Sequence, residues 1–191
     1  FSVKHMELEA HSVARATIPR NDEGVSMIID FGRTRTGITI TQGQIPIFST
    51  TVKVGGSTLT EEIMKHRGVS EEEADVIKRT EGIAACKDEE LCKTLIKSTN
   101  KLIDEIRRHY RFWDTRRDEE GRRIAPINRI YLCGGAVGLR GLPEHVSKLL
   151  QVPVRVGNVW QNLFSFEDHI PGVDRTFSWQ YATVTGLLIE E

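Results

Sequence analysis

The sequence has no surplus of basic or acidic residues and no long apolar run. Its 26 Lys and Arg residues nearly balance its 27 Asp and Glu residues, which gives no basis for binding nucleic acid through bulk charge. Apolar stretches fall well short of the roughly 20 residues that a membrane-spanning helix needs, and the first residues lack a secretory pattern. The sequence therefore predicts no nucleic-acid partner and no direct membrane insertion.

Cysteine is also scarce. The three cysteines, Cys86, Cys92 and Cys133, form no Cys-x-x-Cys pair, and their odd number argues against a disulfide framework. A reducing cytoplasm fits this pattern best. The sequence also lacks an initiator Met and begins with Phe1 inside an apolar–polar alternation, so we interpret the chain as a fragment or an excised domain.

What the sequence does contain predicts an α/β domain. With 191 residues, 39% of them hydrophobic, the chain is long enough to bury a core in one domain or in one domain with two lobes. Apolar runs and alternation predict strands over 1–8, 25–31, 36–41, 45–54, 130–133 and 152–156. Helical periodicity and capping residues predict helices over 9–16, from 57 or 58, from 70, and over 88–113, 142–150 and 179–189. The strands between 25 and 54 follow one another through tight turns and form a β-meander, and the charged stretch 114–126 is expected to be a loop.

The first candidate binding motif is the turn Asp30-Phe31-Gly32-Arg33-Thr34-Arg35-Thr36-Gly37. A buried strand delivers Asp30 to its end, Gly32 permits a sharp turn, and hydroxyl residues follow. Such a turn can direct backbone N–H groups and hydroxyls at phosphate, while the carboxylate holds Mg²⁺ through water. Taken alone, an Asp-x-Gly turn is more often a simple hairpin.

The second candidate is the glycine pair Gly134-Gly135, which follows the strand that ends at Cys133. A strand, paired glycines and then a helix allow a ligand to approach the backbone closely. The spacing of a dinucleotide-binding Gly-x-Gly-x-x-Gly motif is absent. A plain strand-to-helix turn is the alternative interpretation.

The two motifs in this order, with a meander after the first, resemble the actin-like ATPase superfamily. The Asp-x-Gly turn is similar to its second phosphate loop, and the glycine pair is similar to its adenosine loop. Residues 7–14 and 181–187 resemble its two interdomain connecting helices. Within the superfamily, the stretches 54–63, 70–78 and 153–160 resemble the PilM family of type IV pilus assembly proteins, a relative of the division protein FtsA.

This resemblance implies a domain organisation. The expected fold is an actin-like ATPase (ribonuclease H-like) domain with a mixed sheet, a meander and packed helices. Residues 1–191 would be its second, C-terminal domain, with an inserted helical subdomain around 56–112. The N-terminal domain, which carries the first phosphate loop in the superfamily, would lie outside the chain.

The resemblance also implies a site for ATP and Mg²⁺. Glu7 is the catalytic candidate, and Asp30 is the metal candidate. The residues expected to contact the nucleotide are Asp30, Gly32, Thr34, Arg35, Thr36, Asp75, Lys78, Gly134, Gly135 and Ala136.

Three positions depart from the family pattern. Arg35 stands where a threonine is expected, Gly37 where an acid is expected, and Ala136 where a third glycine is expected. The Arg35 guanidinium would pair with phosphates, exclude the third phosphate by its bulk, or face solvent. Since the first phosphate loop is also missing, we expect at most slow ATP hydrolysis.

The function expected from the resemblance is a nucleotide-binding scaffold at the cytoplasmic face of the pilus assembly platform. The partner would be an inner-membrane protein like PilN, whose N-terminal peptide would bind the missing domain. The alternatives are a catalytically active ATPase or phosphotransferase of the same superfamily, and a division protein like FtsA.

Overall fold

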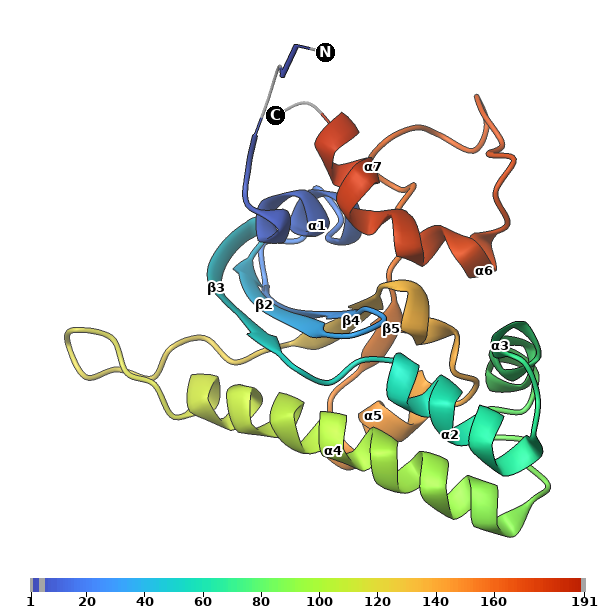
Figure 1. Ribbon diagram of the computed structural model, residues 1–191. Helices are drawn as coiled ribbons and strands as arrows, with labels where there is room; N and C mark the ends of the chain where they lie inside the picture. The colour runs from blue at the N-terminus through green and yellow to red at the C-terminus, as the bar shows by residue number, and fades with distance from the viewer. Residues whose placement is uncertain (1, 4–5, 190–191) are drawn as a thin grey trace.

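The computed structural model describes residues 2–3 and 6–189, and its centre is a five-stranded sheet (Figure 1). The strands lie in the order β3-β2-β1-β4-β5. Their bounds are β1 (Val25–Phe31), β2 (Thr36–Gln42), β3 (Ile45–Val52), β4 (Arg129–Cys133) and β5 (Val154–Val156). The first three pair antiparallel, whereas β1–β4 and β4–β5 pair parallel. The predicted mixed sheet with a meander is confirmed.

Burial explains why the strand sequences differ. β1 and β4 lie inside the sheet with both faces covered, and they read as nearly continuous apolar runs. β3 lies at the sheet edge, and its residues alternate between exposed and half-buried. The apolar runs were therefore sufficient to locate the central strands.

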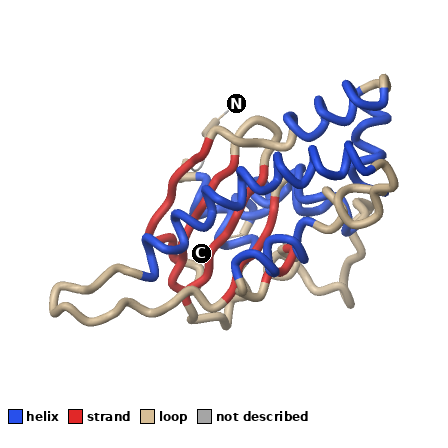
Figure 2. Tube along the Cα trace, turned by 90° about the horizontal axis from the view of Figure 1, so that it is seen from below, coloured by secondary structure: helices blue, strands red, loops and turns tan. Residues whose placement is uncertain are grey.

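Helices cover both faces of the sheet (Figure 1). One layer holds α1 (Glu9–Thr17), α6 (Arg175–Ser178), a 3₁₀ turn (Trp179–Tyr181) and α7 (Ala182–Leu188). The opposite side holds α2 (Ser57–Arg67), α3 (Glu71–Thr80), α4 (Glu89–Asp114) and α5 (Leu142–Leu150). Figure 2 shows the long helix α4 running across the strands. The stretch 56–112, expected to be helical, contains α2, α3 and most of α4.

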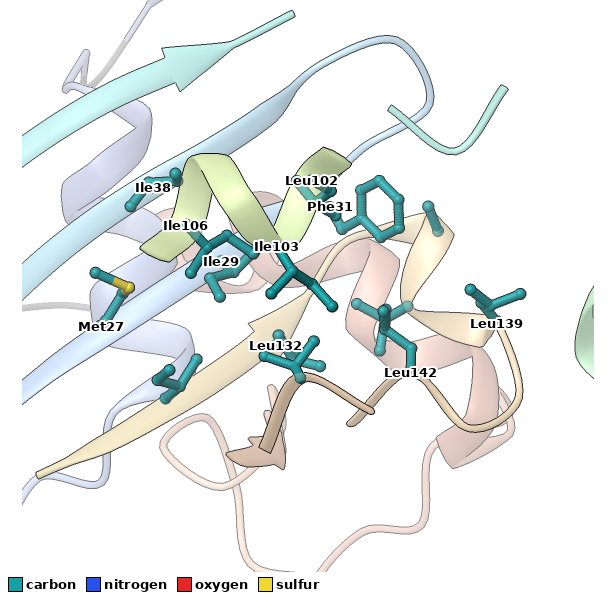
Figure 3. Packing of buried hydrophobic residues seen from close by; sticks show 14 of the residues in the cluster. Met27, Ile29, Phe31, Ile38, Leu102, Ile103, Ile106, Leu132, Leu139 and Leu142 are labelled. Carbon is teal, nitrogen blue, oxygen red and sulfur yellow. The ribbon is translucent and has the colours of Figure 1, made fainter. Parts of the chain in front are cut away.

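Two apolar clusters lie on opposite faces of the sheet. Met27, Ile29 and Phe31 of β1 pack with residues of α4 in the larger cluster (Figure 3). Ile28, on the other face of the same strand, belongs to the cluster beneath α1. The side chains of β1 therefore alternate between the two faces, and this alternation decides which face each polar residue near the strand end occupies.

Helix signals in the sequence match the structure closely. Ser70 and Glu73 form the predicted capping box, in which each side chain accepts a hydrogen bond from the other residue's backbone N–H. Asp88 caps α4 through the backbone N–H of Leu91, at 3.1 Å. The predicted loop 114–126 is confirmed from residue 115 onward, since Asp114 ends α4; it projects from the molecule and contains an isolated bridge between Arg117 and Arg123 (Figure 1).

Two predictions were wrong. Residues 2–3 and 6–8 form no strand, because in the described part of the chain no neighbouring strand supplies the hydrogen-bond ladder that their alternation would need. Cys86 and Cys92 form a disulfide, with Cα atoms 5.8 Å apart, and only Cys133 is free. The first turn of α4 carries Cys92 back beside the connection that contains Cys86, a proximity that the count of cysteines does not reveal.

No described helix is long and apolar enough to cross a membrane.

Candidate functional site

The two glycine turns predicted from the sequence meet at one edge of the sheet. β1 and β4 run parallel, with Asp30 opposite Cys133, so their carboxyl ends lie side by side. Gly134 has φ +91°, and a Cβ there would overlap the Asp30 carboxylate and lie 2.6 Å from the Phe31 carbonyl oxygen. Only glycine accommodates both the conformation and this contact. The turns of the first and second motifs are therefore in direct contact.

The turn after Asp30 is fixed to the start of α2 by backbone hydrogen bonds. The Gly56 N–H donates to the Gly32 carbonyl at 2.9 Å, and the Ser57 N–H donates to the Arg33 carbonyl at 2.8 Å. The Gly32 N–H closes the turn on the Arg35 carbonyl at 3.0 Å. The sheet edge and the α2 helix thus form one connected backbone unit around this turn.

A cavity of about 380 Å³ opens beside these turns, between α2 and α3. Of the predicted binding residues, Asp75, Lys78, Gly135 and Ala136 line it. The cavity is completed by residues that the sequence did not single out: Arg33, Gly56, Ser57, Thr60, Glu61, Met64, Glu71 and Gln180. Most of these lie inside the stretches that carry the family resemblance, but their side-chain directions depend on how α2 and α3 pack.

A buried polar group forms part of the cavity wall. Lys78 is 7% exposed, and its ammonium group pairs with Asp75 and donates to the Thr60 hydroxyl at 2.9 Å. Burial alone would raise the pKa of Asp75, but the hydrogen bond and charge of Lys78 hold it below its usual value. The carboxylate and the hydroxyl remain at the cavity, where a ligand's hydroxyl groups can reach hydrogen-bonding partners.

Asp30 faces a different space. It lines a second cavity of about 300 Å³ between α1 and the meander, together with Glu9 and Thr39. Burial raises the pKa of Asp30 to about 6; Glu9 raises it further, and Arg35 partly opposes both effects. A desolvated carboxylate beside a second carboxylate suits a divalent cation, which prefers oxygen ligands. The residues present therefore fit the predicted Mg²⁺ role of Asp30.

The remaining predicted residues lie apart from the cavity between α2 and α3. Thr34 and Arg35 are exposed in the turn, and neither lines that cavity. Thr36 is buried, and its hydroxyl donates to the Val54 carbonyl at 2.6 Å. The Glu7 carboxylate forms an ion pair with Arg15 of α1. Arg33, in the same turn as Arg35, lines the cavity.

Comparison with known proteins identifies the family to which the chain belongs. A profile of the type IV pilus assembly protein PilM matches residues 2–191. A chain of the PilM-PilN type IV pilus biogenesis complex superposes with a TM-score of 0.73 and 20% identity, covering 97% of this chain and 52% of that chain. The ethanolamine utilization protein EutJ from Carboxydothermus hydrogenoformans gives a TM-score of 0.62 and 18% identity, with 95% and 53% coverage.

A third similar structure is MreB 5 of Spiroplasma citri bound to AMPPNP, with a TM-score of 0.64 and 17% identity, covering 95% of this chain and 57% of that chain. This chain therefore spans about half the length of the solved chains that it matches, and it has the actin-like ATPase fold. With its profile match over nearly every residue, the chain belongs to the PilM family of type IV pilus assembly proteins.

Proposed function

We propose that this chain is the nucleotide-cradling part of a pilus assembly protein that binds ATP with Mg²⁺ and hydrolyses it slowly at most. The observation that supports it best is the contact between the two glycine turns at the edge of a cavity lined by α2 and α3. In this proposal residues 1–191 are the second actin-like domain, with its helical insertion around 56–112, and a first domain outside these residues completes the site.

In this proposal, different described residues contact different parts of the nucleotide. The cavity between α2 and α3 takes the adenosine, with the Asp75 carboxylate and the Thr60 hydroxyl as partners for ribose hydroxyls. Gly135 presents bare backbone to the ligand, and the turn that begins at Gly32 lies beside the phosphates. Asp30 would hold Mg²⁺, directly or through water, and the ion would neutralise charge at the phosphates.

The slow turnover follows from the catalytic candidate. The Glu7 carboxylate forms an ion pair with Arg15, and this pair would have to open before Glu7 could accept a proton from an attacking water. A protein that retains ATP without rapid hydrolysis acts as a scaffold whose shape depends on nucleotide. We propose that this scaffold lies in the cytoplasm and reaches the inner membrane through a PilN-like partner, whose N-terminal peptide binds the other domain. The PilM-PilN complex found among the similar structures supports such a partner.

Calorimetric titration of the intact protein with ATP, with and without Mg²⁺, tests the proposal. Lys78→Met should weaken ATP binding at least about tenfold, because it leaves Asp75 unpaired at the cavity. Lys97→Met is the matched control, since it removes an exposed lysine of α4 that does not line the cavity. Equal affinities for the wild type and both variants would contradict the site, and absence of ATP binding by the wild type would contradict the function.

A further inference from the structure

An ion pair lies in the lining of the proposed nucleotide cavity. The Arg33 guanidinium, in the turn between β1 and β2, lies 2.7 Å from the Glu71 carboxylate in the first turn of α3. Both residues line the cavity. The pair therefore joins the turn beside the phosphates to the helix that carries Asp75 and Lys78.

The two ends of this pair differ in how firmly they are held. The Arg33 backbone is fixed by the hydrogen bond from the Ser57 N–H, and the carbonyl oxygen of Arg33 lies so close to Gly55 that a Cβ there would overlap it. The side chains are free to move by comparison, since Arg33 is 73% exposed and Glu71 is 46% exposed. The guanidinium can therefore change partners without any movement of the sheet.

The charges around the cavity determine which new partner the Arg33 guanidinium can bind. Among the described residues, the lining has three carboxylates, on Glu61, Glu71 and Asp75, and the two cations Arg33 and Lys78. Lys78 is buried and engaged with Asp75 and Thr60. For a phosphate group that enters from solvent, Arg33 is therefore the lining cation that can turn toward it. Glu71 is the group that Arg33 already contacts.

We propose that Glu71 competes with the nucleotide's phosphates for Arg33, so that the ion pair opens when nucleotide binds and closes when it leaves. This inference rests on the function proposed above. The competition lowers nucleotide affinity and couples phosphate binding to release of the N-terminal end of α3 from the turn. Arg33 is then the positioning cation of the phosphates, and Glu71 sets how tightly they are held.

The test is a double-mutant cycle on the intact protein, in which calorimetry measures the affinity for ATP in the presence of Mg²⁺. E71Q should tighten binding about threefold, the scale of an exposed ion pair, and R33Q should weaken it about tenfold. In the R33Q background, E71Q should have no further effect, because the competitor has lost its target. E72Q is the matched control: it removes a neighbouring charge from the same helix turn, but Glu72 does not line the cavity.

Each of the following results would overturn the inference. Equal affinities of E71Q and wild type exclude competition, and weaker binding by E71Q makes Glu71 a direct ligand. A threefold gain in affinity that persists in the R33Q background, or that E72Q reproduces, would mean that the effect comes from the general negative charge near the cavity. A wild type that binds no nucleotide overturns the proposed function as well, whereas normal ATP binding with an unchanged E71Q variant overturns this inference alone.

Discussion

At the scale of single residues, Asp30 is a carboxyl group that the fold keeps largely out of water, with Glu9 nearby. Its pKa is raised from 3.8 to about 6, so the native state binds more protons than the unfolded state between these two values. Stability therefore decreases as the pH rises through that window, and ionised Asp30 costs the apo protein up to about 3 kcal/mol at pH 7. A bound cation would offset this cost.

Asp30→Asn should consequently raise the free energy of unfolding at pH 7 by about 2 kcal/mol in the absence of nucleotide and metal. The gain should shrink as the pH falls and vanish below about pH 4, where the wild-type carboxyl is protonated in both states. Urea denaturation of both proteins from pH 4 to pH 8 measures it. The same variant should lose the Mg²⁺ dependence of ATP binding by the intact protein. A variant less stable than wild type at pH 7, or unchanged Mg²⁺ dependence, would remove Asp30 from this role.

At the scale of elements, the contact between α1 and α7 depends on Gly186. A Cβ at this position would overlap the carbonyl of Ser12, and the Arg15 guanidinium donates to the Gly186 carbonyl at 3.1 and 3.2 Å. Gly186→Ala should lower the free energy of unfolding by at least about 2 kcal/mol, because the helices must separate. Alanine is otherwise the better helix former by about 1 kcal/mol, so a stabilised variant would show that the contact is absent.

Gly172→Ala is the matched control for this substitution. A Cβ at Gly172 meets nothing within 4 Å, and the residue needs no left-handed backbone conformation. Its effect should stay within about 0.5 kcal/mol in the same denaturation experiment.

The disulfide between Cys86 and Cys92 ties the start of α4 to the connection that precedes it. The closed loop is short, since the sequence separation is 6, and loop-closure entropy then predicts a stabilisation of about 2 kcal/mol. Adding a dithiol reductant should lower the free energy of unfolding by that amount. A double variant with serine at both positions should be insensitive to the reductant; a wild type equally insensitive would show that the bond is not formed in solution.

The elements themselves were largely predictable, and the side-chain directions were not. The apolar runs of β1 and β4 and the capping box at Ser70 are local signals, and each was confirmed. The long helix predicted to begin at Asp88 begins at Glu89, with Asp88 as its cap. That the two glycine turns belong to one site was implied by the family resemblance and by no local signal. That Arg33 lines the cavity and Arg35 does not depends on the geometry of a tight turn, and the disulfide depends on how a helix folds back. The local periodicity of apolar residues predicts neither of these features.

At the scale of the whole molecule, the chain spans 52% of the chain that it matches in the PilM-PilN complex. We therefore predict that residues 1–191 alone bind ATP much more weakly than the intact protein. Each charge-assisted hydrogen bond that the other half would supply is worth roughly 1.5–3 kcal/mol, so losing several costs orders of magnitude in affinity. Calorimetry that finds low-micromolar ATP binding by this chain would contradict the prediction.

The packing of α1 against α7 brings an early and a late segment of the chain together on one face of the sheet (Figure 1). Tension applied through the two ends would therefore fall first on this helix pair, which would separate before the sheet bore any load. The hydrogen bonds from the Arg15 guanidinium to the Gly186 carbonyl are among the contacts that such tension would break. In an assembly that transmits movement, this junction would act as the compliant joint, while the sheet and the cavity beyond it keep their shape.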